Sequence, residues 1–265
     1  METNEIVVNN LPKSPIAESF RVFRTNLLYM FQGEKGKIID ITSAEPGDGK
    51  SWITANLAIS FAQFGMKVLI VDADLRKGRQ HRIFGKVNHT GLSDYLRGLT
   101  NNKKNHDKEQ EKEEFYNLIV DTGIENLSLM PSGPVPYNPS ELLGCRNLDK
   151  LLKIAKEEYD VILFDTPPVS ILADSLVICK KVDYVLLVAA ANKTKKELLV
   201  SSKKSIEGVG GNLVGVILNQ IAPESSKDLY ESYEKYSSKK AKKDENIITK
   251  NVKKLSKLVS ARGKQ

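Results

Sequence analysis

The sequence of 265 residues predicts an α/β fold, a doubly wound and mostly parallel sheet with helices on both faces. Three observations carry this prediction. Short, nearly continuous apolar runs indicate strands that are buried on both faces. These runs alternate with segments that suit helices. A glycine-rich loop and several acidic residues directly follow some of the runs, at the sheet edge where such folds bind ligands.

The expected strands are all rich in Val, Ile and Leu. They are Ile38–Thr42, Val68–Asp72, Leu127–Pro131, Val161–Asp165, Tyr184–Ala189 and Val214–Asn219. The segments between them that suit helices are Ser51–Phe64, Asn147–Glu158 and Lys195–Glu207. An earlier helix is expected over Pro15–Phe31, because its apolar residues recur at helical spacing before a turn at Gly33–Gly36.

The remaining segments divide the chain. Residues 101–114 are nearly all charged or amide-bearing, so we expect a solvated insertion loop there. Beyond about Pro223 the sequence becomes polar, Lys-rich and Tyr-containing, which predicts a mobile tail. We therefore expect an N-terminal helical segment over residues 1–36, the main domain over 37–223, and a flexible tail over 224–265.

Composition excludes several classes of protein. The formal charge of +7 lies in the tail: residues 225–265 hold 12 Lys/Arg and 5 Asp/Glu, whereas residues 1–224 hold 28 of each. We therefore expect no specific nucleic-acid binding by the domain. No apolar run approaches the roughly 20 residues that span a bilayer, so a soluble protein is expected. Two distant cysteines and three scattered histidines predict neither a disulfide nor a zinc site.

The segment from Ala44 to Ser51 has the setting of a phosphate-binding loop, because it follows an expected strand and opens an expected helix. Its glycines let backbone N–H groups approach phosphates, and the helix N-terminus favours an anion. Lys50 is expected to contact the β- and γ-phosphates, and the Ser51 hydroxyl to ligate Mg²⁺. The expected nucleotide contacts are Pro46, Gly47, Asp48, Gly49, Lys50, Ser51 and Trp52. The predicted fold is thus P-loop NTPase-like, although Ala44 departs from the usual first glycine.

Carboxylates end two of the expected strands. Asp72 and Asp74 stand two residues apart, a spacing that on a strand points both side chains the same way. Asp165 ends a second apolar strand. Three carboxylates beside a phosphate loop predict a site for MgATP, with Ser51, Asp72 and Asp165 as the metal ligands.

The loop, the run from Asp72 to Arg76 and the run Asp165-Thr166-Pro167-Pro168 together resemble the bacterial protein-tyrosine kinases of capsule and exopolysaccharide synthesis. The resemblance extends from about Pro15 to Asn219. In that family the loop often has Ala or Ser at the position of Ala44. The Walker A, A′ and B motifs match Ala44–Ser51, Val68–Arg76 and Val161–Asp165. The resemblance implies ATP and Mg²⁺ as cofactors and Lys50, Asp72, Asp74 and Asp165 as catalytic residues.

Two further features match the family. Glu18, Arg21 and Arg24 fit its E-x-x-R-x-x-R motif, which mediates ring-like self-association, and they lie along one face of the expected helix. Three tyrosines, Tyr230, Tyr233 and Tyr236, correspond to the C-terminal cluster that the family autophosphorylates, here expected in trans. About thirty residues follow the cluster, either as a basic amphipathic helix that contacts anionic lipid or as a solvated extension.

The resemblance implies an ATP-dependent protein-tyrosine kinase that regulates capsular or exopolysaccharide synthesis or export. It implies as partners a membrane-anchored polysaccharide chain-length or activator protein, further copies of the chain, protein tyrosine substrates and a cognate phosphotyrosine phosphatase. The expected location is the cytoplasm, with peripheral recruitment to the inner face of the membrane. Asp72 or Asp74 is expected to accept the proton of the phenol. Asn219 either reads the adenine base or caps its strand.

Two alternative functions are also compatible with a nucleotide-binding loop. Partition and division-site switch ATPases of the same superfamily carry a second lysine where this chain has Glu45, and a carboxylate cannot neutralise phosphate charge across a dimer. The second alternative is a non-catalytic scaffold that binds nucleotide and assembles. The presence of Lys50 and of all three aspartates argues against a scaffold, because pseudoenzymes commonly lose one of them.

Overall fold

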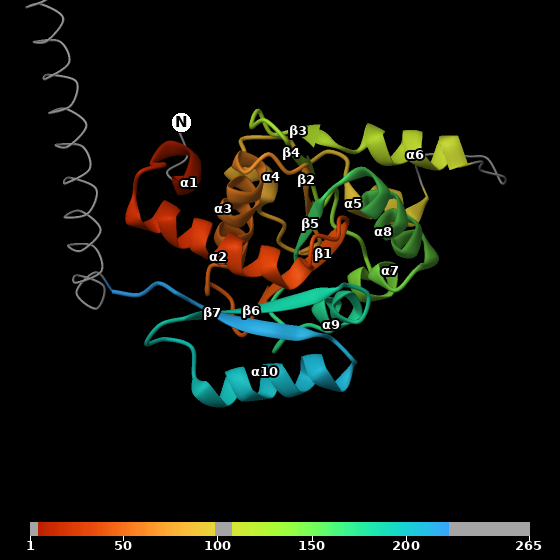
Figure 1. Cartoon of the computed structure of the whole chain (residues 1–265). Coiled ribbons are helices and arrows are strands. Elements are labelled where there is room, and N and C mark those ends of the chain that lie inside the picture. The colour runs from red at the N-terminus through yellow and green to blue at the C-terminus, as the bar shows by residue number, and fades with distance from the viewer. Residues whose placement is uncertain (1–4, 99–107, 223–265) are drawn as a thin grey trace, which may run out of the picture. The chain divides into compact units, whose positions relative to one another are not determined.

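A seven-stranded sheet forms the centre of the fold in the computed structural model, which describes residues 5–98 and 108–222 (Figure 1). The chain divides into two units, residues 1–220 and 221–265, and the fold below is that of the first unit. The strand order is β3-β4-β2-β5-β1-β6-β7. The strands are β1 (Lys37–Ser43), β2 (Val68–Asp72), β3 (Val120–Asp121), β4 (Leu127–Met130), β5 (Val161–Asp165), β6 (Tyr184–Ala190) and β7 (Leu213–Asn219).

The strand pairs are parallel throughout, except for the antiparallel contact between the short β3 and β4. Ten helices are described. They are α1 (Val7–Asn10), α2 (Pro15–Phe31), α3 (Lys50–Gln63), α4 (Gln80–Ile83), α5 (Leu92–Arg97), α6 (Lys108–Asn117), α7 (Pro139–Leu143), α8 (Arg146–Glu158), α9 (Asp174–Cys179) and α10 (Lys196–Gly208). This confirms the doubly wound α/β prediction.

Alternation along the central strands explains why helices cover both faces. In β5, Val161 and Leu163 join one buried cluster, which also contains apolar residues of α2 and α3. Ile162 and Phe164 join a second cluster together with residues of α5, α6 and α8. Because successive strand residues point to opposite faces, an unbroken apolar run supplies both clusters at once.

The helix α3 is the innermost helix, because it packs against the sheet on one side and against α1 and α2 on the other. Its residues from Ile53 to Ala62 are buried, which is why its sequence lacks a polar stripe. Ring pairs join α2 to this layer: Phe31 stacks on Phe61 at 6.0 Å and on Tyr184 of β6 at 5.7 Å. Such pairs contribute about 0.5–1.5 kcal/mol each beyond their buried area.

Two features of the predicted organisation were wrong. Residues 108–114 belong to the helix α6 rather than to a loop. Phe115 of this helix is fully buried, and Lys112 pairs with Glu158 of α8 at 2.7 Å. Tertiary contacts therefore stabilise a helix in a segment whose charged and amide-bearing residues predict a solvated loop. The strand β7 is less buried than predicted: among the described residues it pairs only with β6, and Val216 is 54% exposed.

Candidate nucleotide-binding site

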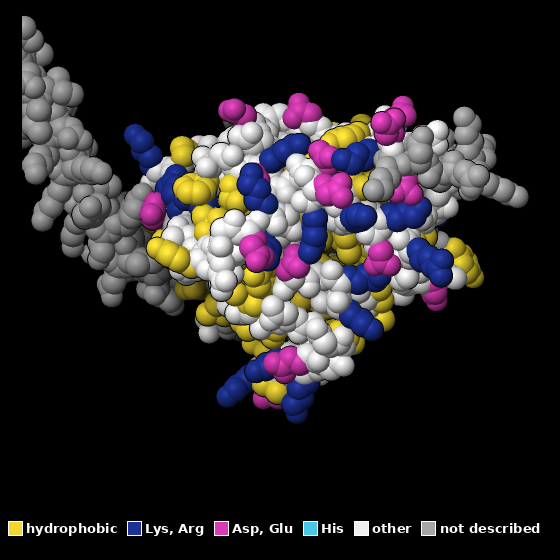
Figure 2. All heavy atoms as spheres, turned by 45° about the vertical axis from the view of Figure 1, so that its right-hand side comes forward, with side chains coloured by type: hydrophobic (Ala, Val, Ile, Leu, Met, Phe, Trp, Pro, Cys, Tyr) yellow, Lys and Arg dark blue, Asp and Glu magenta, His cyan; other side chains and the backbone are white. Residues whose placement is uncertain are grey.

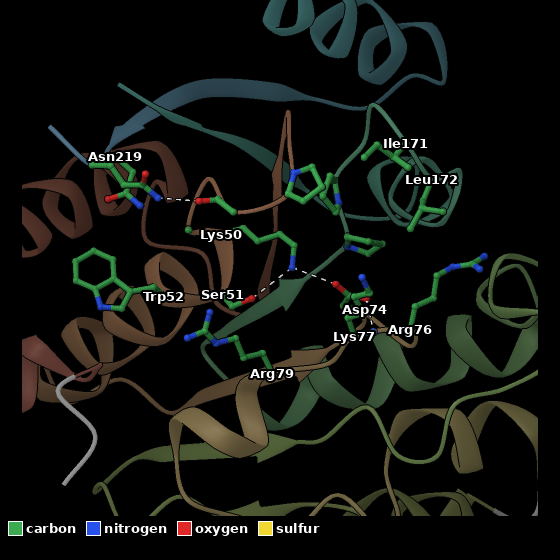
Figure 3. Close-up of a pocket in the computed structure, with 16 residues that line it drawn as sticks. Lys50, Ser51, Trp52, Asp74, Arg76, Lys77, Arg79, Ile171, Leu172 and Asn219 are labelled. Atoms are coloured by element: carbon green, nitrogen blue, oxygen red, sulfur yellow. Dashed lines mark hydrogen bonds and ion pairs between the residues drawn. The ribbon is translucent and has the colours of Figure 1, made fainter. Parts of the chain in front are cut away.

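A cavity of about 750 Å³ opens at the carboxyl ends of the central strands (Figure 3). It is the edge where parallel α/β sheets bind ligands. The phosphate loop and the first turn of α3 contribute to its lining, together with the segments that follow β2 and β5 and the end of β7. Its lining residues are Pro46, Gly47, Gly49, Lys50, Ser51, Trp52, Asp74, Arg76, Lys77, Arg79, Pro167, Pro168, Ile171, Leu172, Asn219 and Gln220.

The backbone of the phosphate loop requires its two glycines. Gly47 and Gly49 have φ of 86° and 94°, a region that L side chains rarely adopt. A Cβ on Gly49 would lie 2.2 Å from Nδ2 of Asn219, so a side chain at this position would clash as well as strain the loop. The helix α3 begins directly afterwards, with Lys50 and Ser51 in its first turn. The loop therefore presents a helix N-terminus to the cavity.

Side chains from distant segments clamp the loop. Asp48 accepts hydrogen bonds from the Glu45 amide and from the Thr194 hydroxyl, both at 2.8 Å. Asn219 Nδ2 donates to the Asp48 carbonyl at 2.9 Å, and Gln220 Nε2 donates to the Gly47 carbonyl at 2.7 Å. The Asp48 carboxylate thus binds the loop itself. No local pattern in the sequence indicates Thr194 or Gln220, because each is a polar residue in a connecting segment.

Lys50 lies among the predicted carboxylates. Its Nζ is 3.2 Å from Asp74 Oδ2, 3.5 Å from Asp165 Oδ1 and 3.3 Å from Ser51 Oγ. Burial lowers the pKa of Lys50, but attraction to Asp165, Asp74 and Asp72 outweighs burial and raises the pKa overall. Lys50 is therefore held as a cation at the loop, where Figure 3 shows it pointing toward Ser51 and Asp74.

Asp72 and Asp165 lie opposite each other in the β2–β5 register. Burial raises the pKa of Asp72 well above its usual range, and the neighbouring Asp165 carboxylate raises it further. The strand β2 ends at Asp72, which agrees with the predicted range Val68–Asp72. Asp74 lies beyond the strand, where its Oδ1 accepts from the Lys77 amide at 2.9 Å.

A buried glutamine that the sequence did not indicate joins these groups. Gln80 is fully buried at the start of α4. Its amide N–H donates to Asp72 Oδ2 at 2.9 Å, and its Nε2 donates to Asp165 Oδ2 at 2.8 Å and to the Ser51 carbonyl at 3.0 Å. Glutamine is usually exposed, so only the folded structure reveals it here.

The predicted metal ligands fit Mg²⁺ by their chemistry. Within the described residues, Asp72 Oδ1, Asp165 Oδ1 and Gln80 Oε1 are buried acceptors without a hydrogen-bond donor, although the Lys50 ammonium lies 3.5 Å from Asp165 Oδ1. Buried acceptors without donors are costly, and a cation would satisfy them. Mg²⁺ prefers hard oxygen ligands and uses one or two carboxylates together with substrate phosphates. Asp72, Asp165 and the Ser51 hydroxyl supply such a set.

The rim of the cavity is basic on one side and apolar on the other. Arg76 forms a two-point ion pair with the buried Asp174, with Nε–Oδ2 at 2.8 Å and Nη2–Oδ1 at 3.2 Å. Arg79 pairs with Glu5 at 2.6 Å. The apolar side includes Pro168 and Ile171, whose side chain is 61% exposed. Trp52 also lines the cavity and packs edge-on against Phe20 of α2 at 5.5 Å.

The predicted self-association residues lie on α2, away from the cavity lining, and make contacts within the chain. Arg21 Nη1 pairs with Glu18 Oε2 at 2.8 Å. Arg24 Nη1 donates to the Ser60 carbonyl at 2.8 Å, and the Arg24 guanidinium lies 4.5 Å from the centre of the Phe64 ring. Tyr230, Tyr233 and Tyr236 lie outside the described residues.

No helix in residues 5–98 and 108–222 combines the length and the apolarity needed to cross a membrane. On the face drawn in Figure 2, the described Lys and Arg side chains are interspersed with Asp and Glu. That face therefore carries no continuous basic surface.

The fold, the loop and the strand-end carboxylates define a P-loop nucleotide-binding protein. Residues 36–209 match the AAA domain family. A putative tyrosine-protein kinase CapB of Staphylococcus aureus is 33% identical over 228 residues, which cover 86% of this chain and 94% of the relative. The tyrosine-protein kinase YwqD of Bacillus subtilis is 36% identical over 83% of this chain and 86% of its own. The chain therefore belongs to the bacterial tyrosine-protein kinases.

Solved structures agree with this assignment. The kinase domain of the Escherichia coli tyrosine kinase ETK superposes with a TM-score of 0.73 at 33% identity, covering 82% of this chain and 80% of that one. The cell division ATPase MinD of Pyrococcus furiosus superposes less well, with a TM-score of 0.57 at 26% identity over 74% of this chain and 80% of that one. The similarity to MinD shows that a cell division ATPase shares this architecture.

Proposed function

We propose that this chain is an ATP-dependent protein-tyrosine kinase that autophosphorylates its C-terminal cluster, Tyr230, Tyr233 and Tyr236, in trans. The convergence of Lys50, Asp74 and Asp165 at the phosphate loop carries the proposal, since it supplies the groups that phosphoryl transfer needs. Sequence similarity to tyrosine-protein kinases supports tyrosine as the acceptor of the phosphoryl group. The proposed role is to regulate capsular or exopolysaccharide synthesis or export.

The nucleotide would bind with its phosphates on the amides of Gly47, Gly49 and Ser51 and beside the Lys50 ammonium. Mg²⁺ held by Ser51, Asp72 and Asp165 would neutralise phosphate charge. Lys77 lines the cavity and adds positive potential near the transferred group, whereas Arg76 and Arg79 are paired with Asp174 and Glu5. Trp52 and Asn219 also line the cavity and are proposed to contact the nucleotide, with Asn219 reading the base.

The acceptor phenol needs a base, and the geometry favours Asp74 over Asp72. Asp74 lines the cavity, whereas Asp72 is fully buried beneath it and accepts from the Gln80 amide. The phenol has an unperturbed pKa of about 10, so its proton leaves as the bond to phosphorus forms. We propose that Asp74 receives this proton, and that Pro168 and Ile171 contact the acceptor ring.

Assembly and partners follow from the family resemblance. Glu18, Arg21 and Arg24 are proposed to contact a neighbouring copy in a ring, which requires their bonds within the chain to be exchanged for bonds to the neighbour. A membrane-anchored chain-length or activator protein is the proposed activator. It would recruit the kinase from the cytoplasm to the inner face of the membrane. A cognate phosphotyrosine phosphatase would reverse the modification.

A switch ATPase is the second candidate, favoured only by the structural similarity to MinD. Glu45 argues against it, because its backbone amide is fixed to Asp48 and its side chain is acidic where a switch ATPase carries lysine. Intact Lys50 and aspartates likewise argue against a non-catalytic scaffold.

The test is phosphosite mapping of the purified full chain by mass spectrometry after incubation with MgATP. We expect phosphate on Tyr230, Tyr233 or Tyr236, and none in an Asp74→Asn variant that retains its circular dichroism spectrum. The proposal fails if no tyrosine is modified even with the membrane activator present. ATP hydrolysis stimulated by DNA or lipid without phosphotyrosine would instead support the switch ATPase.

A further inference from the structure

The loop from β4 to α7, residues 131–138, carries a tyrosine that the proposed mechanism does not use. The Tyr137 side chain is 97% exposed. It follows Val135, which is 68% exposed, and Pro136, which is buried, and Asn138 after it is exposed, so Tyr137 lies on an outward-facing part of the loop. An exposed phenol on the surface of a tyrosine kinase is a candidate acceptor.

The loop is anchored on both sides of Tyr137. The Pro131 carbonyl accepts from the Leu92 amide at 2.8 Å, and the Pro134 carbonyl accepts from the Ser93 hydroxyl at 2.7 Å. Beyond Tyr137, the Asn138 carbonyl accepts from the Leu142 amide at 3.1 Å, where α7 begins. The two ends of the loop are thus held by hydrogen bonds. This lowers the conformational entropy that the loop loses when Tyr137 enters the active site of another molecule.

The other described tyrosines serve as internal comparisons. Six of the nine tyrosines lie in the described part of the chain. Tyr95 and Tyr159 are buried, and the hydroxyls of Tyr116 and Tyr184 donate to Glu158 and to the Met30 carbonyl. Tyr29 is 81% exposed but lies within α2, whose helical backbone cannot follow an extended path into a cleft. Tyr137 alone among the six combines an exposed ring with a backbone outside helices and strands.

The surroundings of Tyr137 also favour the phosphorylated product. Tyr137 lines a cavity of about 480 Å³ together with Arg97, at the end of α5, and Glu141. Within the described residues, Arg97 forms no ion pair. A phosphotyrosine carries a charge of about −1.5 to −2 and pairs well with a guanidinium, whereas Glu141 repels it. Arg97 is thus the available counter-ion.

We infer that Tyr137 is a second phosphorylation site, modified by another copy of the kinase; this inference rests on the proposed function. Tyr137 is absent from the lining of its own nucleotide cavity, which makes the transfer intermolecular. The phenolic oxygen forms a bond to the γ-phosphorus of ATP, and the bond from that phosphorus to the β–γ bridging oxygen breaks. ADP leaves, and the phenolic proton passes to Asp74 of the copy that binds the ATP.

The experiment uses the full chain in which Tyr230, Tyr233 and Tyr236 are all replaced by Phe. It is incubated with MgATP alongside the wild type, and tryptic peptides are mapped by mass spectrometry. We expect the triple variant to retain phosphotyrosine on the peptide that contains Tyr137. Adding Tyr137→Phe should remove this signal, whereas adding Tyr29→Phe, the matched exposed residue, should leave it unchanged.

The outcomes separate the inference from the function. Phosphate on the wild-type tail with none on Tyr137 overturns the inference and leaves the kinase standing. Residual phosphate on Tyr29 in place of Tyr137 overturns it as well. Absence of phosphotyrosine from the wild type, with the membrane activator present, removes the proposed function and the inference together.

Discussion

The nucleotide cavity and the α2–α3 layer differ in the side chains that they bury, which are charged at the cavity and aromatic in the layer. At the cavity, Lys50 lies among three carboxylates, and Asp72 and Asp165 each have a buried oxygen without a hydrogen-bond donor. In the α2–α3 layer, Phe31 stacks on Phe61 and on Tyr184 of β6, and the Tyr184 hydroxyl donates to the Met30 carbonyl. Buried charge in this protein therefore serves ligand binding, whereas buried apolar area supplies stability.

The largest expected effect tests the cavity. Lys50→Met should lower the rate of phosphotyrosine formation about a thousandfold, because it removes the cation beside the transferred group. The variant should keep its fold, as judged by circular dichroism. Lys67→Met is the matched control: this lysine lies 5.0 Å from the Tyr159 ring and outside the cavity lining, so the rate should not change. Equal losses in both variants would contradict the assignment.

The next effect tests the α2–α3 layer. Phe61→Ala should lower the free energy of unfolding by about 3–4 kcal/mol, since it opens a cavity beneath Phe31. Phe64→Ala should cost about 1 kcal/mol or less, because Phe64 is 58% exposed and its ring contacts Arg24. Chemical denaturation measures both. Similar costs at the two positions would show that burial does not decide stability in this layer.

A third prediction concerns a buried carboxyl beneath the cavity. Burial raises the pKa of Asp40 to about 7, although Thr166 and Cys179 donate to it at 2.7 and 3.2 Å. The folded state holds the Asp40 proton more tightly than the unfolded state does. The contribution of this proton to the free energy of unfolding is therefore fully present below pH about 4 and is lost as pH rises to about 7. Asp40→Asn should remove about 3–4 kcal/mol of this pH dependence.

Denaturation curves at several pH values check this expectation. Glu125→Gln, at an exposed acidic residue, serves as the control and should keep the wild-type slope. An unchanged slope in Asp40→Asn would assign the pH dependence to other groups.

The smallest effect tests the hydrogen-bonded support of the metal ligands. Gln80→Leu removes the two Nε2 hydrogen bonds, to Asp165 and to the Ser51 carbonyl. Affinity for MgADP should fall about tenfold, as is typical when an outer partner of a metal ligand is lost. Titration calorimetry with and without Mg²⁺ should show the smaller change for metal-free ADP. The control variant Gln63→Leu, at an exposed glutamine of α3, should bind MgADP and metal-free ADP as the wild type does. An equal loss of affinity for the two ligands in Gln80→Leu would indicate a general disturbance of the loop.

Local patterns explain which parts of the site could be predicted. The apolar runs, the glycine spacing of the loop and the carboxylates at Asp72 and Asp165 are properties of short segments, and parallel strands bring their ends together without further information. Residues whose role depends on distant partners were missed. The role of Gln80 depends on its hydrogen bonds to Asp165 and Ser51, which are distant in sequence. Thr194 contacts Asp48 only because β6 lies beside β1.

The sequence by itself determined the layer order, the phosphate loop and the acidic strand ends, because residue type and spacing encode burial and backbone conformation. Only the tertiary structure decided that Asp74 rather than Asp72 lines the cavity, that Arg24 bonds to α3, and that Tyr137 projects from an anchored loop. The physical reason is that exposure and long-range hydrogen bonds depend on how segments pack, which no local pattern records.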